Sequence, residues 1–404
     1  MQHSRNRDLD GVRGLAILLV VAAHSGLPIR WGGLSGVTLF FVLSGYLITS
    51  LLIREWDRWG SVSLWRFWGR RALRLLPALL VFLALVPLLL WATGDSRLAS
   101  YPAAAMASLF YVGNWVRIAG TDLGVLNHLW SLSVEEQFYV VWPLVFLALM
   151  AWWRQHLLGL VLGLTGVATV YSVWAKGSFI RLDISTETNA FALLLGVSLA
   201  VALASIARKG WHPPRVSVLI PFTVMILVSA FPSHDIATDH GLFRPLGAVY
   251  AVLGVWLVAS AVLGHSPVVA SPVMVFFGTI SYALYLWHQA LINSVLFGDK
   301  TVLRNLALIA AAVVLSWLSW VVVERPAGRL RGRLRLDEPS RRQLVARAVA
   351  SVPSSSLDPR GLPDAPGRPG SPGTSGTAGP PGSADTLAAR ADREGPDQPA
   401  SPST

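Results

Sequence analysis

The sequence predicts an all-α fold: a polytopic membrane helix bundle of about ten transmembrane helices with a disordered C-terminal tail. Of the 404 residues, 53% are hydrophobic and only 14% are charged, whereas charged residues usually make up about a quarter of a soluble chain. Aliphatic runs long enough to cross a ~30 Å hydrocarbon core also recur between residues 12 and 323. Together these two observations indicate an integral membrane protein.

The apolar runs give the order of the expected helices. The first run is expected to be retained as a helix, because no small-residue cleavage site ends it and another run follows at once. The predicted spans cover residues 12–27, 35–53, 75–93, 137–153, 157–175, 188–206, 216–231, 243–264, 274–297 and 302–323. The segment 95–136 is too polar for a full span, although its AAAMASLFYVGNW piece is apolar enough to lie along or dip into the outer face. No internal repeat is evident, which disfavours transporter folds built from duplicated halves.

The charge of the chain is placed asymmetrically. The net charge of +11 comes largely from arginines clustered before the first span, in the loop 54–74, near residue 208 and after residue 324. These clusters fall on one side of the membrane if the spans alternate, which is the positive-inside pattern. We therefore expect a multi-pass protein of the cell membrane with both termini in the cytoplasm and the lipid bilayer, not nucleic acid, as its partner.

The composition changes abruptly near residue 329. The segment SSSLDPRGLPDAPGRPGSPGTSGTAGPPGS has too few large apolar groups to offset the entropy of ordering. The expected organisation is a membrane domain over residues 1–328 and a disordered cytoplasmic tail over residues 329–404. The chain has no cysteine, which excludes disulfides, an enzyme-bound thioester and cysteine metal sites.

The first span carries two polar groups on one face. Arg13 and His24 are eleven positions apart, which is roughly three helical turns and roughly 16 Å along the axis. Arg13 alone fits an interfacial anchor, and His24 alone fits a histidine satisfied by a backbone carbonyl. Their shared face favours a functional pair, because ionisable groups inside spans are costly.

Two further clusters lie near span entrances. Arg71 and Arg74 are neighbours on a helix surface and suit either positive-inside charge or a phosphate clamp. Glu135 and Glu136 point roughly 100° apart on a helix, so only one of them is expected to face the bundle interior. The other reading for one of the acids is a favourable interaction with a helix N-terminus.

A late span carries a polar stripe of Ser281, Tyr285 and His288, whose spacing places them on one helix face. The stripe fits interhelical hydrogen bonding or a reactive site. The segment SHDIATDH (residues 233–240) looks ligand-like, but its spacing matches no strong metal motif. No metal is assigned there.

These segments together resemble the membrane-bound acyltransferase-3 family over residues 8–328. One family motif is a basic residue followed, after ten intervening residues, by a histidine. It appears as Arg13 and His24 in LDGVRGLAILLVVAAHSG. The other matching motifs, in the family's order, are GVTLFFVLSGYLIT, the arginine pair 71 and 74, WSLSVEEQFY, SYALYLWH and VVVERP with Glu324.

The resemblance implies an O-acyltransferase that moves an acyl group, expected to be acetyl, from cytoplasmic acyl-CoA to a hydroxyl of a sugar-containing acceptor. Acyl-CoA is then a co-substrate and no cofactor is expected. Glu135 matches the family's constant acid better than Glu136. Many relatives carry an extra extracytoplasmic hydrolase-like domain, which this sequence lacks. We therefore expect transfer to finish inside the bundle or through a separate partner.

The residues then receive expected roles. Arg71 and Arg74 would bind acyl-CoA, with arginines at the cytoplasmic mouth holding its phosphates. Arg13 is grouped with His24 and Glu135 as a catalytic residue, and His24 would deprotonate the acceptor or carry the acyl group as an acyl-imidazole. Glu135 would orient or charge-balance His24, and Tyr285 or His288 would polarise the thioester carbonyl. The outer turn 28–36, with its sequence WGGLSG, would leave room for the acceptor.

Other functions remain open from the sequence. The acceptor is a cell-envelope glycan, a lipid-linked sugar or a secondary metabolite such as a macrolide. A proton-coupled exporter would use the buried histidine and glutamate as a relay. A non-catalytic scaffold would use the tail as an interaction arm.

Overall fold

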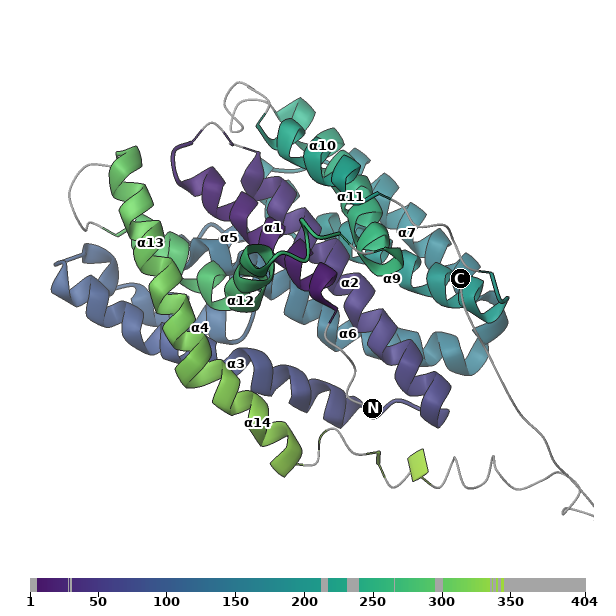
Figure 1. Ribbon diagram of the computed structural model, residues 1–404. Coiled ribbons are helices and arrows are strands. Elements are labelled where there is room, and N and C mark those ends of the chain that lie inside the picture. Colours follow the sequence, from purple (N-terminus) through teal and green to yellow (C-terminus); the bar gives the residue numbers. More distant parts are fainter. Residues whose placement is uncertain are drawn as a thin grey trace, which may run out of the picture. The chain divides into compact units, whose positions relative to one another are not determined.

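The structure is a computed structural model that describes residues 6–27, 29, 31–211, 217–230, 240–264, 266–294, 301–334, 336, 339, 340, 343 and 344. Every regular element in this part of the chain is helical (Figure 1). The α-helices are α1 (Arg7–His24), α2 (Gly32–Trp59), α3 (Leu64–Ala92), α4 (Tyr101–Leu109), α5 (Gly113–Ile118), α6 (Trp130–Trp152), α7 (Leu157–Trp174), α8 (Phe179–Ile184), α9 (Thr186–Arg208), α10 (Leu219–Ser229), α11 (His240–Leu263), α12 (Pro272–Ile292), α13 (Val302–Ser319) and α14 (Arg325–Arg333). Short 3₁₀ turns are η1 (Ser96–Leu98), η2 (Gly124–Leu129) and η3 (Arg154–His156), and η4 (Trp320–Glu324) is a π-helical turn.

The predicted fold class is confirmed. In the described part of the chain, eight helices are long and apolar enough to cross a membrane. Two predicted spans fall short of that standard: α1 carries four charged residues in its first seven positions, and α10 has only 11 residues. The expected number of about ten is therefore approximate.

Several helices are longer than their apolar stretches. The expected loop 54–74 is mostly helical, because α2 continues to Trp59 and α3 begins at Leu64. Hydropathy detects only the part of a helix that is apolar, whereas arginine and glutamate continue a helix readily. Gly60 ends α2 at a φ of +66°, a left-handed conformation that a side chain disfavours.

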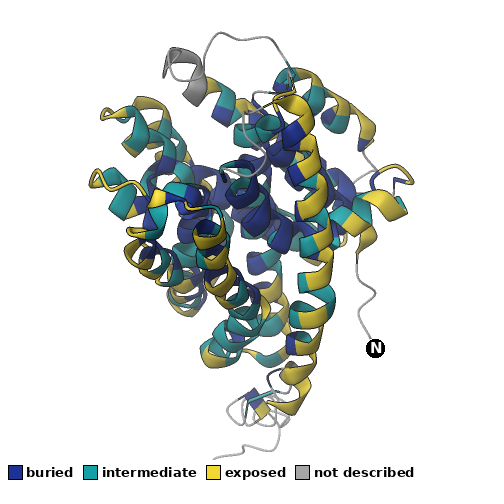
Figure 2. Cartoon of the chain, turned by 90° about the vertical axis from the view of Figure 1, so that its left-hand side faces the viewer, coloured by how far each residue is buried: buried dark blue, intermediate teal, exposed yellow. Residues whose placement is uncertain are grey.

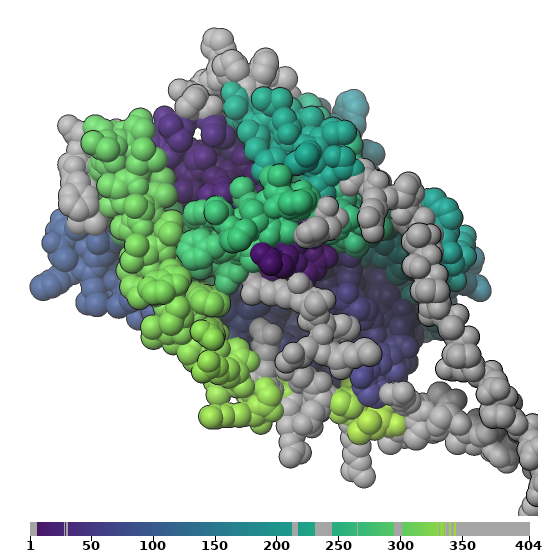
Figure 3. All heavy atoms as spheres, viewed as in Figure 1, coloured from purple at the N-terminus to yellow at the C-terminus, as the bar shows by residue number. Residues whose placement is uncertain are grey.

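The central helices touch through glycine. A Cβ on Gly14 of α1 would lie 2.1 Å from the carbonyl oxygen of Met274, and one on Gly45 of α2 would lie 1.9 Å from that of Leu193. Small residues at such positions let membrane helices approach backbone to backbone. Figure 3 shows α1 only in patches, because α12 crosses in front of it on this face.

The sequence WGGLSG is helical and does not form the expected outer turn, because helix α2 already begins at Gly32. A Cβ on Gly32 would lie 2.4 Å from the Leu19 carbonyl oxygen, and one on Gly36 would lie 2.5 Å from that of Ala16. Gly32 and Gly36 therefore serve the contact between α1 and α2, whereas Gly33 and Leu34 line the cavity that contains His24.

The segment 95–136 forms η1, α4, α5, η2 and the first turns of α6. The elements η1, α4 and α5 are too short to span, whereas η2 and α6 together form one of the candidate spans, Gly124–Trp152. Buried residues gather in the middle of the bundle, and the outward faces of the long helices are exposed (Figure 2). On α7 the exposed side chains include leucine and valine, which is the lipid-facing surface expected of a membrane helix.

Contacts continue past the expected domain end at residue 328. Helix α14 runs to Arg333, and the carbonyl oxygen of Leu336 accepts a 2.7 Å hydrogen bond from Arg70. The Gln343 amide donates at 2.8 Å to the Glu55 carboxylate. The expected tail therefore begins with residues that touch α2 and α3, and its part from residue 345 onward lies outside the described residues.

Candidate active site

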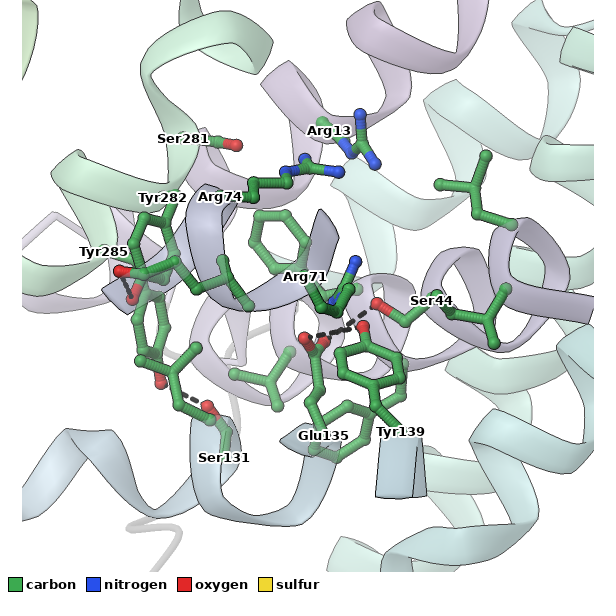
Figure 4. Close-up of a pocket in the computed structure, with 17 residues that line it drawn as sticks. Arg13, Ser44, Arg71, Arg74, Ser131, Glu135, Tyr139, Ser281, Tyr282 and Tyr285 are labelled. Atoms are coloured by element: carbon green, nitrogen blue, oxygen red, sulfur yellow. Dashed lines mark hydrogen bonds between the residues drawn. The ribbon is translucent and has the colours of Figure 1, made fainter. Parts of the chain in front are cut away.

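The arginine cavity is a polar space between α1, α2, α3, α6 and α12 (Figure 4). Arg71 and Arg74 lie three positions apart on α3, so one helical turn brings both to the cavity. Arg13 enters from α1 and Glu135 from α6. The polar lining consists of Arg13, Ser44, Arg71, Arg74, Ser131, Glu135, Tyr139, Ser281, Tyr282 and Tyr285. The structure thus brings together residues from five separate parts of the sequence.

Glu135 is held in place by hydroxyl groups. Ser44 donates to its Oε1 at 3.0 Å, and Tyr139 donates to its Oε2 at 3.1 Å. The Arg71 guanidinium lies 3.6 Å from the centre of the Tyr139 ring, a cation–π contact that fixes it over the same carboxylate. These contacts fix the position of the Glu135 carboxylate in the cavity.

Glu136 faces a different space. It lines an apolar groove beside the arginine cavity, and its Oε1 is 3.8 Å from the Arg71 Nη2. Both acids therefore lie near Arg71, but only Glu135 lines the arginine cavity, in agreement with the 100° separation expected on a helix.

A second cavity continues from the arginine cavity toward the start of α1. We call it the mouth cavity; it is lined by Asp10, Arg13, Arg74, Glu324 and Arg325, among others. Arg13 and Arg74 line both spaces. Glu324 ends the π-helical turn η4, and such turns are often found at functional sites.

A third space, the histidine cavity, lies near the end of α1. It is lined by His24 of α1, His128 of η2, and Tyr285 and His288 of α12. The ring centres of His24 and His288 are 5.2 Å apart, and those of His128 and His288 are 5.5 Å apart. The Tyr285 hydroxyl donates to the His128 carbonyl oxygen at 2.7 Å.

Backbone carbonyls determine which imidazole nitrogens carry hydrogen. His24 Nδ1 lies 2.7 Å from the Val20 carbonyl oxygen, and His288 Nδ1 lies 2.9 Å from that of Tyr285. A carbonyl only accepts, so each Nδ1 must be protonated, and in the neutral ring Nε2 keeps the lone pair. His24 Nε2 is therefore available as a base or nucleophile.

The three cavities are neighbours in a row. The arginine cavity and the histidine cavity share Val37 and Tyr285 in their linings. Arg13 and His24, predicted from one helix face, thus lie in successive spaces along α1. Ser281, Tyr285 and His288 follow the same row on α12, from the mouth cavity to the histidine cavity.

The placement of Glu135 differs from the expectation that it would orient His24. Its carboxylate contacts Ser44 and Tyr139, whereas the His24 ring contacts Val20 and His288. The nearest imidazole partners of His24 come instead from η2 and α12.

Sequence reasoning missed several polar residues of the histidine cavity, namely His128, Asn127, Arg117, Asp183 and Asn189. His128 is the first residue of HLWSLSVEEQFYVVWP (residues 128–143), the segment that carries Glu135 and Glu136, so its place in that segment was a signal. The others lie on short helices and turns, which carry no strong pattern. Burial lowers the pKa of Arg117 from its ordinary value, and the nearby Asp183 carboxylate opposes this effect.

In the described residues, no group of three or more His, Cys, Asp or Glu side chains is arranged to hold a metal ion. Of the ligand-like segment 233–240, residues 233–239 lie outside the described residues.

The fold and the site define a multi-pass membrane protein with a row of polar cavities inside its helix bundle. A family model described as "Acyltransferase domain" matches residues 6–321. The chain belongs to this acyltransferase family, the membrane-bound acyltransferase-3 family indicated by its motifs.

Two curated relatives are similar over most of this chain. Peptidoglycan O-acetyltransferase OatA of Listeria monocytogenes is 32% identical over 349 residues, which is 79% of this chain and 55% of the relative. O-acetyltransferase OatA of Staphylococcus aureus is 29% identical over 369 residues, which is 85% of this chain and 60% of the relative. The chain thus spans little more than half the length of these relatives. No solved structure matches it.

Proposed function

We propose that this protein is an integral membrane O-acyltransferase that moves an acetyl group from acetyl-CoA to a hydroxyl of a cell-envelope glycan. The family membership and the names of the relatives support acyl transfer and a glycan acceptor. The observation that carries the proposal is the row of cavities, which joins a cluster of arginines to His24 through the interior of the bundle.

The donor enters at the arginines. Arg13, Arg71 and Arg74 bind the phosphates of CoA, for which guanidinium groups are suited by charge and geometry. The pantetheine arm then extends through the arginine cavity toward His24. The axial separation of Arg13 and His24, roughly 16 Å by helical rise, is of the order that such an arm spans. The arginine-rich end faces the cytoplasm by the positive-inside rule.

Transfer takes place in the histidine cavity. His24 Nε2 accepts the proton of the acceptor hydroxyl, and the hydroxyl oxygen attacks the thioester carbonyl carbon. As the tetrahedral intermediate collapses, the C–S bond breaks and the CoA thiolate takes the proton back from the imidazolium. The products are the O-acetyl ester and free CoA. Tyr285 lines the same cavity and polarises the carbonyl once its hydroxyl turns away from the His128 carbonyl oxygen. His288 does so only as an imidazolium, because in the neutral ring its Nε2 keeps the lone pair.

The route through an acyl-imidazole uses the same residues in two steps. His24 Nε2 then attacks the thioester carbonyl first, the C–S bond breaks, and CoA leaves as the thiolate. The acceptor hydroxyl, or a hydroxyl of a separate extracytoplasmic partner, takes the acetyl group from the acyl-imidazolium, and its proton neutralises the thiolate.

The decisive experiment uses protein reconstituted in one orientation in sealed vesicles. Labelled acetyl-CoA is supplied on the face that carries the arginine-rich loops, and an N-acetylglucosamine oligomer is supplied on one face at a time. We expect labelled oligomer only when the oligomer is on the opposite face, with His24→Ala protein as the blank. Product formed only with both substrates on the arginine face would overturn the two-sided arrangement. The absence of any protein-dependent thioester consumption would overturn acyl transfer itself.

A further inference from the structure

The histidine cavity is lined by one acidic and one basic side chain that have no role in the chemistry above. Arg117 comes from α5 and Asp183 from α8, and both line the cavity together with His24. They interact electrostatically with each other, but no ion pair within 4 Å joins them in the described part of the chain. A gap therefore separates two opposite charges beside the proposed base.

The two side chains keep most of their hydrogen-bonding capacity. Arg117 Nη1 donates to the Asn127 carbonyl oxygen at 3.1 Å, which uses one of five N–H groups. Among the described residues, the Asp183 carboxylate has no hydrogen-bond partner; only its backbone oxygen is bonded, by the Asn189 amide at 2.7 Å. Polar groups in such a cavity are usually satisfied by protein, water or ligand.

The helices that carry them are rigidly joined. The Asn114 amide on α5 donates to Thr186 Oγ1 at 3.0 Å, just beyond the end of α8. The Gln137 amide on α6 donates to Asn114 Oδ1, also at 3.0 Å. This network fixes α5, α6 and the α8–α9 junction to one another, so the positions of Arg117 and Asp183 are set before any ligand arrives.

We propose that Arg117 and Asp183 form the acceptor subsite and select an uncharged, polyhydroxylated sugar unit. The proposal rests on the acyltransferase function above and adds the residues that read the acceptor. A hydroxyl group is both donor and acceptor. It therefore donates to Asp183, which only accepts, and accepts from Arg117, which only donates. The Trp130 ring, which lines the same cavity, offers an apolar surface for the sugar ring.

The charges also act against other acceptors. Arg117 and Asp183 carry opposite charges that balance. A carboxylate that pairs with Arg117 would be repelled by Asp183, and an ammonium group that pairs with Asp183 would be repelled by Arg117, whereas a hydroxyl group leaves the charges balanced. Charge repulsion between a ligand and its site discriminates between otherwise similar ligands. The subsite therefore favours a neutral unit over a uronic acid of the same size.

The test compares two acceptors on full-length purified protein with acetyl-CoA as donor. One acceptor is a neutral N-acetylglucosamine oligomer, and the other is an oligomer of the same length that carries carboxylates. Asp183→Asn should raise the KM for the neutral oligomer about tenfold, as expected from loss of a charged hydrogen bond. It should also increase the relative use of the carboxylated oligomer, while the affinity for CoA stays at the wild-type value.

Arg181→Gln is the matched control, because Arg181 lies on the same helix but is exposed and pairs with Glu187. It should leave both acceptors unaffected. Arg117→Lys provides a second variant, which keeps the charge but loses the fork of donors, and it should raise the KM for the neutral oligomer without changing CoA affinity.

The outcomes separate this inference from the proposed function. Wild-type activity combined with an unchanged acceptor KM and acceptor preference in both variants would overturn the subsite and leave acyl transfer intact. If Asp183→Asn protein fails to fold, the Arg117→Lys result decides alone. A wild-type protein that consumes no acetyl-CoA with either acceptor would overturn both.

Discussion

Three histidines from three separate segments meet at one end of the bundle. His24, His128 and His288 have ring centres within 5.5 Å of a neighbour in the cluster. His128 Nε2 lies 3.1 Å from the Leu286 carbonyl oxygen, so this ring, too, is fixed by a backbone acceptor. Each neutral imidazole is thereby held in one tautomer, in which one nitrogen carries the proton and the other keeps its lone pair.

His24→Ala should abolish transfer while acetyl-CoA binding is retained, because the arginines proposed to bind the donor lie in other cavities. We expect a fall in kcat of at least about 100-fold, the range for loss of a general base. Steady-state assays with labelled acetyl-CoA measure it. His156→Ala, at an exposed position in η3, is the control and should behave as wild type. Retention of more than about a tenth of the wild-type rate in His24→Ala would refute the role of His24.

Arg71→Ala and Arg74→Ala should weaken donor binding. Removal of either charge from the arginine cavity should raise the KM for acetyl-CoA, more strongly for the double variant. Isothermal titration with CoA measures the affinity directly. Arg58→Ala is the control, since Arg58 is exposed at the end of α2 and lies over Trp59. Unchanged CoA affinity in the double variant would show that these arginines serve only as positive-inside charge and do not bind the donor.

At the scale of the elements, close helix packing decides where the reactive side chains point. Gly278 of α12 would place a Cβ 1.8 Å from the Asp10 carbonyl oxygen, and Gly196 of α9 would place one 2.0 Å from that of Val42. Helices held this close cannot rotate independently. The polar stripe of α12 is therefore fixed toward α1, and the Arg13–His24 face of α1 is fixed toward the cavities.

Gly45→Ala should destabilise the bundle. The new methyl group would overlap the Leu193 carbonyl oxygen, and overpacking of this kind costs about 1–3 kcal/mol. Gly163→Ala on α7 is the matched control, because nothing lies within 4 Å of its added Cβ. It should be neutral or stabilise by up to about 1 kcal/mol through helix propensity. Thermal unfolding in detergent, followed by tryptophan fluorescence, compares the two. Equal Tm values would show that α2 and α9 are not held by this contact.

At the scale of the whole molecule, the bundle separates two chemical environments. The mouth cavity lies beside the first residues of α1, and the histidine cavity lies beside its last residues. The arrangement permits an anionic donor to stay at one end while a hydroxyl acceptor is bound at the other. The apolar exterior of helices such as α7 then serves only to hold this chamber in the bilayer.

Two truncations test the start of the C-terminal segment. A chain ending at residue 344 keeps every described contact and should match the full-length Tm and activity. A chain ending at residue 335 loses the Leu336 acceptor of Arg70 and the Gln343 donor to Glu55. Its Tm should fall by a few degrees, with transfer activity retained because no residue of the cavities is removed. Loss of activity in a stable 344-residue protein would show that the distal tail takes part in the chemistry.

The sequence by itself determined the fold class and which polar side chains share a helix face. Hydrophobic runs of spanning length leave only a helix bundle as a solution, since backbone groups in lipid must be satisfied within each segment. Helical periodicity placed Arg13 with His24, Arg71 with Arg74, and Ser281 with Tyr285 and His288. Each of these groupings is local, so the regular geometry of one helix was sufficient to predict it.

Only the tertiary structure decided which groups share a space. It placed Glu135 with Ser44 and Tyr139, not with His24, and it brought His128 to His24 from 104 positions away. It also assigned the glycines 32 and 36 to helix packing and the residues 336 and 343 to contacts with α2 and α3. These outcomes depend on how helices rotate and approach one another, and that is set by close packing between distant segments, which no single segment encodes.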